Sequence, residues 1–103
     1  MEYIITKAQL YRVMTKFLNN FKNTHEETFF EDFIWLSKPN AEEFILDMQY
    51  EYNDGKLSIN IYWLEDFINW FPINKKDAED FIKDWFEQTY DVTVQSVESY
   101  NLI

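Results

Sequence analysis

The sequence predicts a single α+β domain over residues 1–103, with a small antiparallel sheet covered on one face by an N-terminal and a C-terminal amphipathic helix. Two stripes of apolar residues at helical spacing, near the two ends of the chain, indicate the helices. A central Asp-Gly turn between two alternating segments indicates a hairpin, and a segment rich in valine and threonine indicates a last strand. A hydrophobic fraction of 47% and an aromatic fraction of 20% are typical of a folded core.

The first helix is predicted over residues 7–22. Thr6 and Gln9 form a capping box pattern, in which each side chain bonds the backbone N–H of the other residue. Ile5 before the cap and Leu10 inside the helix form a hydrophobic staple. The apolar residues then recur every three or four positions, which gives one stripe facing the core: Leu10, Val13, Met14, Phe17, Leu18 and Phe21.

Residues 24–37 allow two interpretations. Two Thr-x-x-Glu patterns within residues 24–31 would each cap a short helix. The same residues suit a loop or helical turn followed by a short strand over 33–37, and we favour this second interpretation. Lys38-Pro39-Asn40 is a turn signal that ends either element.

The hairpin is predicted around Asn53-Asp54-Gly55-Lys56, with Asp-Gly at the centre of a tight type I′ turn. Gly55 is the only glycine of the chain, and it supplies the positive φ that this turn needs. With Asn53 opposite Lys56, the apolar face pairs Tyr52 with Leu57, Tyr50 with Ile59, Met48 with Ile61 and Leu46 with Trp63. The other face pairs Glu51 with Ser58, Gln49 with Asn60 and Asp47 with Tyr62. We expect the first face to pack on the helices and the second to face water or a partner.

The C-terminal half is predicted to hold two helices and a strand. A short helix over residues 64–71 ends at Pro72. Asn74 then caps a helix over residues 75–89, whose buried stripe is Ala78, Phe81, Ile82, Trp85, Phe86 and Thr89. Residues 92–98 are predicted to form the last strand.

The residue inventory argues against an enzyme, and we expect no cofactor and no metal. The chain has no cysteine, which excludes disulfides, zinc–cysteine sites and cysteine nucleophiles, and its one glycine cannot build a phosphate-binding loop. His25-Glu26 begins like a zinc-protease motif, but position 29 is Phe instead of His, so we expect His25 to be a surface or capping residue. The acidic run of residues 26–32 lacks the pattern of a calcium loop and is expected to be a solvated face.

The net charge of −10 points to the class of partner. It repels phosphate backbones and anionic lipids, so we expect no direct nucleic-acid or membrane binding, and it attracts a basic protein. Solubility alone would explain the same charge. Residues 1–23 carry a net +3 and the rest −13, which favours intramolecular pairing or head-to-tail self-association. We find no long apolar segment and no signal-peptide pattern, and we expect a cytoplasmic protein.

The candidate partner-binding residues are acidic or aromatic. Steps of three, four and three residues place four carboxylates on one helix face, about 4.5–6 Å apart along the axis: Asp77, Asp80, Asp84 and Glu87. Such a row can occupy lysines and arginines that otherwise bind phosphates, although an ordinary solvated face has the same composition. The polar hairpin face adds Asp47, Glu51 and Tyr62. Four rings that we do not place in the core would suit a protein-binding patch or a homodimer: Trp35, Tyr62, Trp70 and Tyr100.

The opening Tyr3-Ile4-Ile5-Thr6 with Gln9, the Asp-Gly hairpin and the late acidic helix with its Trp85 resemble small acidic proteins of tailed phages over most of the chain. The resemblance implies a host-cell context, in which such proteins often block enzymes that handle nucleic acids, sometimes by mimicking DNA. It implies no site residue. We therefore expect an inhibitor of the anti-CRISPR or anti-restriction type, which binds a basic host nuclease, polymerase or defence effector. The alternatives are a virion or assembly component, a homo-oligomer, or an immunity protein against a basic toxin nuclease.

Overall fold

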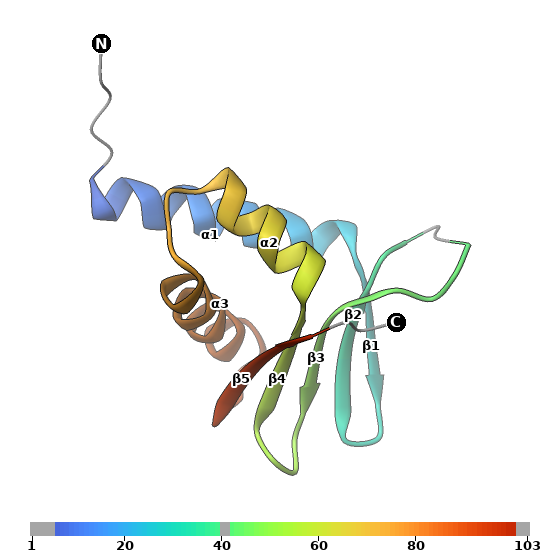
Figure 1. Cartoon of the computed structure of the whole chain (residues 1–103). Helices are drawn as coiled ribbons and strands as arrows, with labels where there is room; N and C mark the ends of the chain where they lie inside the picture. The colour runs from blue at the N-terminus through green and yellow to red at the C-terminus, as the bar shows by residue number, and fades with distance from the viewer. Residues whose placement is uncertain (1–5, 40–41, 101–103) are drawn as a thin grey trace.

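The computed structural model describes residues 6–39 and 42–100, and it confirms the α+β class (Figure 1). Five strands form one sheet in the order β1-β2-β3-β4-β5, and the helices cover one of its faces. The elements are α1 (Lys7–Thr24), β1 (Glu26–Phe30), β2 (Phe33–Ser37), β3 (Leu46–Glu51), β4 (Lys56–Asn60), α2 (Ile61–Trp70), α3 (Lys75–Tyr90) and β5 (Ser96–Tyr100).

The sheet is mixed, where the sequence predicted an antiparallel one. Strands β1 to β4 pair antiparallel, but β5 pairs parallel to β4. The reason is the connection, because the chain leaves β4, passes through α2 and α3 and returns in the same direction, as a crossover must. Strand β5 also begins four residues later than predicted, because residues 92–95 form the loop that precedes it. The N–H of Gln95 donates to the carbonyl of Gly55 over 2.6 Å, which connects this loop to the β3–β4 turn.

Helix α1 has the predicted cap. Thr6 Oγ1 accepts from the N–H of Gln9 over 3.2 Å, and Gln9 Oε1 accepts from the N–H of Thr6 over 3.0 Å. The partner expected for Leu10 in the staple, Ile5, lies outside the described residues. Val13 was wrongly placed in the core, because it is 53% exposed while Met14 is buried. One residue along a helix is a turn of about 100°, which carries Val13 to the edge of the stripe.

Residues 26–30 form strand β1, so the loop or helical turn that we favoured for this segment was wrong, as was the short helix. The strand joins β2 through a two-residue turn, Glu31-Asp32, and every residue of β1 has a partner on β2. Glu31 takes a φ of 50° there. The turn is supported from outside the hairpin, because the N–H of Tyr52 donates to the Asp32 carbonyl over 2.8 Å. This pairing with a neighbouring strand outweighs the local capping patterns.

The central hairpin forms, but its predicted register was wrong by two residues. Tyr50 lies opposite Leu57 and Met48 opposite Ile59, so the loop holds the four residues 52–55 instead of two. A shift of two keeps the side chains of the paired residues, 48–51 and 56–59, on their predicted faces. Gly55 has the expected positive φ, 61°.

Strand β4 ends earlier than predicted, at Asn60. The Asn60 Oδ1 accepts from the N–H of Tyr62 over 3.0 Å and caps α2, which therefore begins at Ile61 instead of residue 64. The strand pairs expected for Ile61, Tyr62 and Trp63 do not form. Helix α3 follows its prediction closely, with Asn74 Oδ1 accepting from the N–H of Asp77 over 2.8 Å.

The core lies between the sheet and the helices. Its largest fully buried side chains come from every layer: Met14 and Leu18 of α1, Met48 and Ile59 of the sheet, Phe67 of α2, Ile82 and Phe86 of α3. Tyr62 and Trp70 are exposed and Trp35 is half-buried, as their doubtful place in the core suggested. The side chain of Tyr100 lies outside the description. Within residues 6–39 and 42–100, no helix has the length and apolar character needed to cross a membrane.

Candidate functional site

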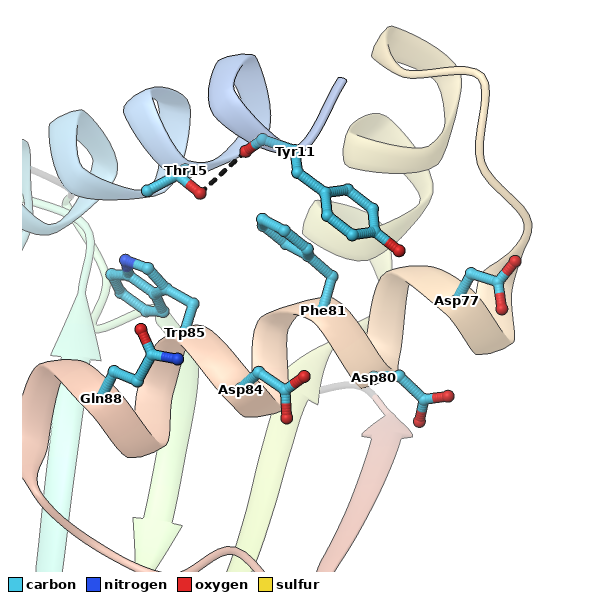
Figure 2. A pocket seen from close by; sticks show the side chains of 8 residues that line it. All are labelled: Tyr11, Thr15, Asp77, Asp80, Phe81, Asp84, Trp85 and Gln88. Atoms are coloured by element: carbon cyan, nitrogen blue, oxygen red, sulfur yellow. Dashed lines mark hydrogen bonds between the residues drawn. The ribbon is translucent and has the colours of Figure 1, made fainter. Parts of the chain in front are cut away.

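A groove lies between α1 and α3 and encloses about 380 Å³ (Figure 2). Figure 2 shows three carboxylates in a row along α3, beside aromatic rings that fill the space between the two helices. The lining residues are Tyr11, Thr15, Asp77, Asp80, Phe81, Asp84, Trp85 and Gln88. The groove therefore brings three of the predicted partner-binding residues together with aromatic side chains.

The aromatic part of the groove is held in place by contacts between the two helices. The Trp85 Nε1–H donates to Asn19 Oδ1 over 2.9 Å, which fastens α3 to α1. The Tyr11 and Phe81 rings lie 5.1 Å apart between centroids, at 46°. Ring pairs at this distance attract each other beyond the burial of their area. These contacts fasten the two helices that form the walls of the groove to each other.

The three aspartates keep most of their capacity to bind a cation. Asp77 accepts one bond from the Asn74 side chain, over 3.1 Å, as part of the helix cap. Asp80 lies 3.7 Å from the exposed ammonium of Lys76, one turn earlier on α3. A surface pair of this kind contributes only about 0.3–0.5 kcal/mol, so a partner can displace it. Asp84 has no hydrogen bond or ion pair with any residue that the structure describes.

A cation from the chain itself already lies over one ring of the groove, although it does not line the groove. The Lys7 ammonium lies 5.4 Å from the centre of the Tyr11 ring. This is within the range of a cation–π contact, which contributes about 0.5–1 kcal/mol at an exposed site. The groove therefore offers two kinds of attraction to a cationic side chain, ring faces and carboxylates.

Glu87, the fourth carboxylate of the predicted row, has a different role. Its Oε2 accepts from the N–H of Val94 over 2.9 Å and so fixes the loop that leads into β5. Nearby, Tyr50 donates its hydroxyl to the Thr93 carbonyl over 2.6 Å. Burial first, then the charges of Tyr52 and Glu87, raise the pKa of Tyr50 above its usual 10.0. Glu87 is thus bound within the chain, and the groove uses three aspartates instead of four acids.

The three candidates on the hairpin do not form one patch. Glu51 lies half-buried at the turn end of the sheet, opposite Lys56, and Tyr62 lies exposed at the start of α2. Asp47 is 1% exposed, and its Oδ2 lies 2.6 Å from Nε2 of His25. The expectation that the whole polar face meets solvent was therefore wrong for Asp47, and also for Ser58 and Asn60, which are buried.

His25 is the C-cap residue of α1, as one of its two expected roles required, and its N–H donates to the Phe21 carbonyl over 3.1 Å. The other expected role, a surface residue, was wrong, because its side chain is only 13% exposed and Nδ1 also contacts the Phe21 carbonyl over 2.9 Å.

Two features of the site could not be seen in the sequence pattern. Tyr11 lies off the apolar stripe of α1, and only the packing of α1 on α3 shows that it completes the groove. Phe81 and Trp85 were assigned to the core, but their outer edges also line the groove. The one signal of the groove in the sequence was Tyr11, an aromatic residue that lies off the apolar stripe of α1.

The part of the chain that the structure describes contains no group of three or more histidine, aspartate or glutamate side chains arranged to hold a metal ion. The groove thus combines a row of three carboxylates on α3 with aromatic rings beside it. No protein-family model, curated protein or solved structure matches the chain.

Proposed function

We propose that this protein binds a basic partner protein through the groove between α1 and α3 and occludes the surface it covers, without chemistry. One observation supports this proposal above the others. The aspartates Asp77, Asp80 and Asp84 line one groove together with the rings of Tyr11, Phe81 and Trp85. Lysine and arginine side chains suit this lining, because the carboxylates accept charge-assisted bonds and the rings take the apolar stems.

The spacing of the aspartates supports a nucleic-acid-binding surface as the target. Carboxylates that step by three and four residues along a helix are about 4.5–6 Å apart along its axis. A surface that binds successive phosphates holds its lysines and arginines at similar intervals. Occupying them would inhibit a nuclease, polymerase or defence effector, which agrees with the phage context implied by the resemblance. The net charge of −10 would speed the encounter at low salt.

The test compares two variants of equal net charge. Asp77→Asn, Asp80→Asn and Asp84→Asn together neutralise the groove, while Glu26→Gln, Asp54→Asn and Glu65→Gln together neutralise three exposed acids elsewhere. Both raise the net charge to −7 from −10.

Each variant and the parent protein would be used to capture proteins from a host lysate at about 50 mM and about 300 mM salt. Each captured protein would then be purified and its affinity measured. We expect a basic nucleic-acid-binding protein that binds the parent and the control variant, binds the groove variant at least about tenfold more weakly, and is released by salt. Equal loss of affinity in both variants would show that only net charge matters, and unchanged affinity in the groove variant would remove the groove from the site.

A homo-oligomer or assembly component is the second candidate, and strand β1 favours it. This strand is at the edge of the sheet, and its Phe29 and Phe30 are 65% and 50% exposed. An edge strand with exposed apolar residues is a template for pairing with another chain. Sedimentation velocity over a hundredfold range of protein concentration tests this candidate. A protein that stays monomeric over the whole range would exclude it.

A further inference from the structure

A second pocket of about 240 Å³ opens beside the start of α2, where Lys38 after β2 and Glu43 and Ile45 before β3 line it. It shares no lining residue with the groove between α1 and α3. Ile45 and Trp63 give it apolar walls, and Glu43 and Asp66 add two carboxylates. The pocket also reaches Asp47, the buried carboxylate that pairs with His25.

Asp47 is buried because the sheet is irregular at this point. The register shifts between Leu36 and Ser37 on β2, which lie opposite Met48 and Leu46, and this leaves Asp47 as the extra residue of a bulge on β3. Bulges redirect a side chain away from its regular alternation. The alternation of the strand predicted that this carboxylate faces outward, and the bulge explains why it is instead 99% buried.

One oxygen of this carboxylate has no partner. Oδ2 contacts His25, but Oδ1 is buried and has no hydrogen bond to any residue in 6–39 or 42–100. A buried acceptor without a donor costs about 1–3 kcal/mol, and more if it is charged. Buried polar atoms without partners are rare in folded proteins, so this oxygen points to a donor other than the residues that the structure describes.

The contacts of His25 define what Oδ1 can accept. Nδ1 lies 2.9 Å from the carbonyl oxygen of Phe21, which can only accept, and 3.5 Å from the Thr24 hydroxyl, so the shorter of these contacts is a hydrogen bond when Nδ1 holds the proton. One further proton lies between Nε2 and Asp47 Oδ2. On whichever of these two atoms it resides, Oδ1 has no proton and can only accept. The missing group is therefore a hydrogen-bond donor.

We propose that this pocket binds a primary ammonium group on a short alkyl chain, which donates a hydrogen bond to Asp47 Oδ1. An ammonium suits a single free oxygen, whereas a guanidinium binds best as a fork to both oxygens, and His25 occupies the other one. The alkyl chain lies against Ile45 and Trp63. Glu43 and Asp66 attract the charge, and Lys38 is the one cationic side chain of the lining that opposes it.

The probes are n-butylammonium, its neutral analogue 1-butanol, and n-butylguanidinium, each titrated into the full-length protein. Backbone amide signals and the indole N–H signal of Trp63 report binding by NMR. We expect n-butylammonium to bind with a dissociation constant of about 1–10 mM, with shifts centred on Ile45 and Trp63. 1-Butanol binding equally well, or n-butylguanidinium binding more tightly, would overturn the proposal, as would the absence of shifts.

Variants separate this pocket from the proposed function. Asp47→Asn should weaken n-butylammonium binding about 10- to 100-fold, the effect of losing a charge-assisted bond. Because this variant can fail to fold, Ile45→Trp provides a second test, since it fills the pocket and should abolish binding. Lys38→Gln should tighten binding. The groove variant with three asparagines should bind n-butylammonium as the parent does, so failure of the groove leaves this proposal standing. Parent-like affinity in both Asp47→Asn and Ile45→Trp would refute it.

A further probe identifies the source of the ammonium. Nα-acetyl-lysine amide carries the same group on a peptide backbone. If it binds as tightly as n-butylammonium, the pocket suits a lysine side chain of another protein. If n-butylammonium binds and the lysine amide does not, the ligand is a free alkylamine. If neither probe binds, the proposal is overturned.

Discussion

His25→Ala should destabilise the protein strongly, although the His25 side chain is partly accessible. Asp47 is 1% exposed and the His25 side chain 13%, and their atoms approach to 2.6 Å. Removing one partner of such a buried pair leaves a carboxylate without its proton donor, which costs about 3–5 kcal/mol. The His25 ring also packs on Phe21 at 3.9 Å between centroids, and that contact is lost as well. A domain of this size has about 5–15 kcal/mol of unfolding free energy, so a large part of it is removed.

The assay is urea unfolding followed by tryptophan fluorescence, for His25→Ala, Asp47→Leu and the double variant. We expect the double variant to be at least about 1 kcal/mol more stable than the sum of the two single losses predicts, because it leaves no uncompensated charge. A loss below about 1 kcal/mol in His25→Ala, or additive losses in the double variant, would refute the reasoning that the pair acts as a unit.

Three further predictions concern single contacts. Gly55→Ala should lower the unfolding free energy by about 1–3 kcal/mol, because φ is 61° and the new Cβ would lie 2.6 Å from Cγ of Gln95; parent-like denaturation midpoints would contradict this. Thr6→Ala should cost about 1 kcal/mol through loss of the cap on α1, whereas Thr6→Ser should cost little; thermal melts of the two variants compare them. The contribution of Tyr50 and Tyr90 to stability should be fully present below about pH 10 and fall as the pH rises further, since burial raises the pKa of both side chains above 10.0 and the unfolded chain then loses their protons first. Unfolding curves between pH 8 and pH 11 measure this fall, and replacing both tyrosines with phenylalanine should reduce it; an equal fall in that variant would assign it to other groups.

Features encoded by neighbouring residues could be predicted from the sequence. The caps of α1 and α3 depend on residues three positions apart, and both formed as expected. The three aspartates of the groove were found for the same reason, because helical spacing alone places them on one face. The faces of the β3–β4 hairpin were also predicted, since alternation survives a register shift of two residues.

Features that depend on distant residues were not predictable. Strand β1 exists because β2 offers it a partner, while its own residues favour helix capping patterns equally well. The direction of β5 depends on how α2 and α3 cross the sheet, and the burial of Asp47 depends on a bulge that no local pattern announces. Tyr11 joins the groove only through the packing of α1 on α3.

The parallel pairing of β5 with β4 has a consequence for synthesis of the chain. Lys56 pairs with Ser96, forty residues later, while the neighbouring strands β1 to β4 are joined by short connections. At about 5–20 residues per second, a ribosome needs roughly 2–8 s to make the intervening segment. During this time β4 is an open edge of a four-stranded sheet whose apolar face, with Leu57 and Ile59, has yet to receive α3. The emerging protein is therefore most exposed to aggregation or chaperone binding until β5 has been made and paired, and its yield should respond to the rate at which the codons for α3 and β5 are translated.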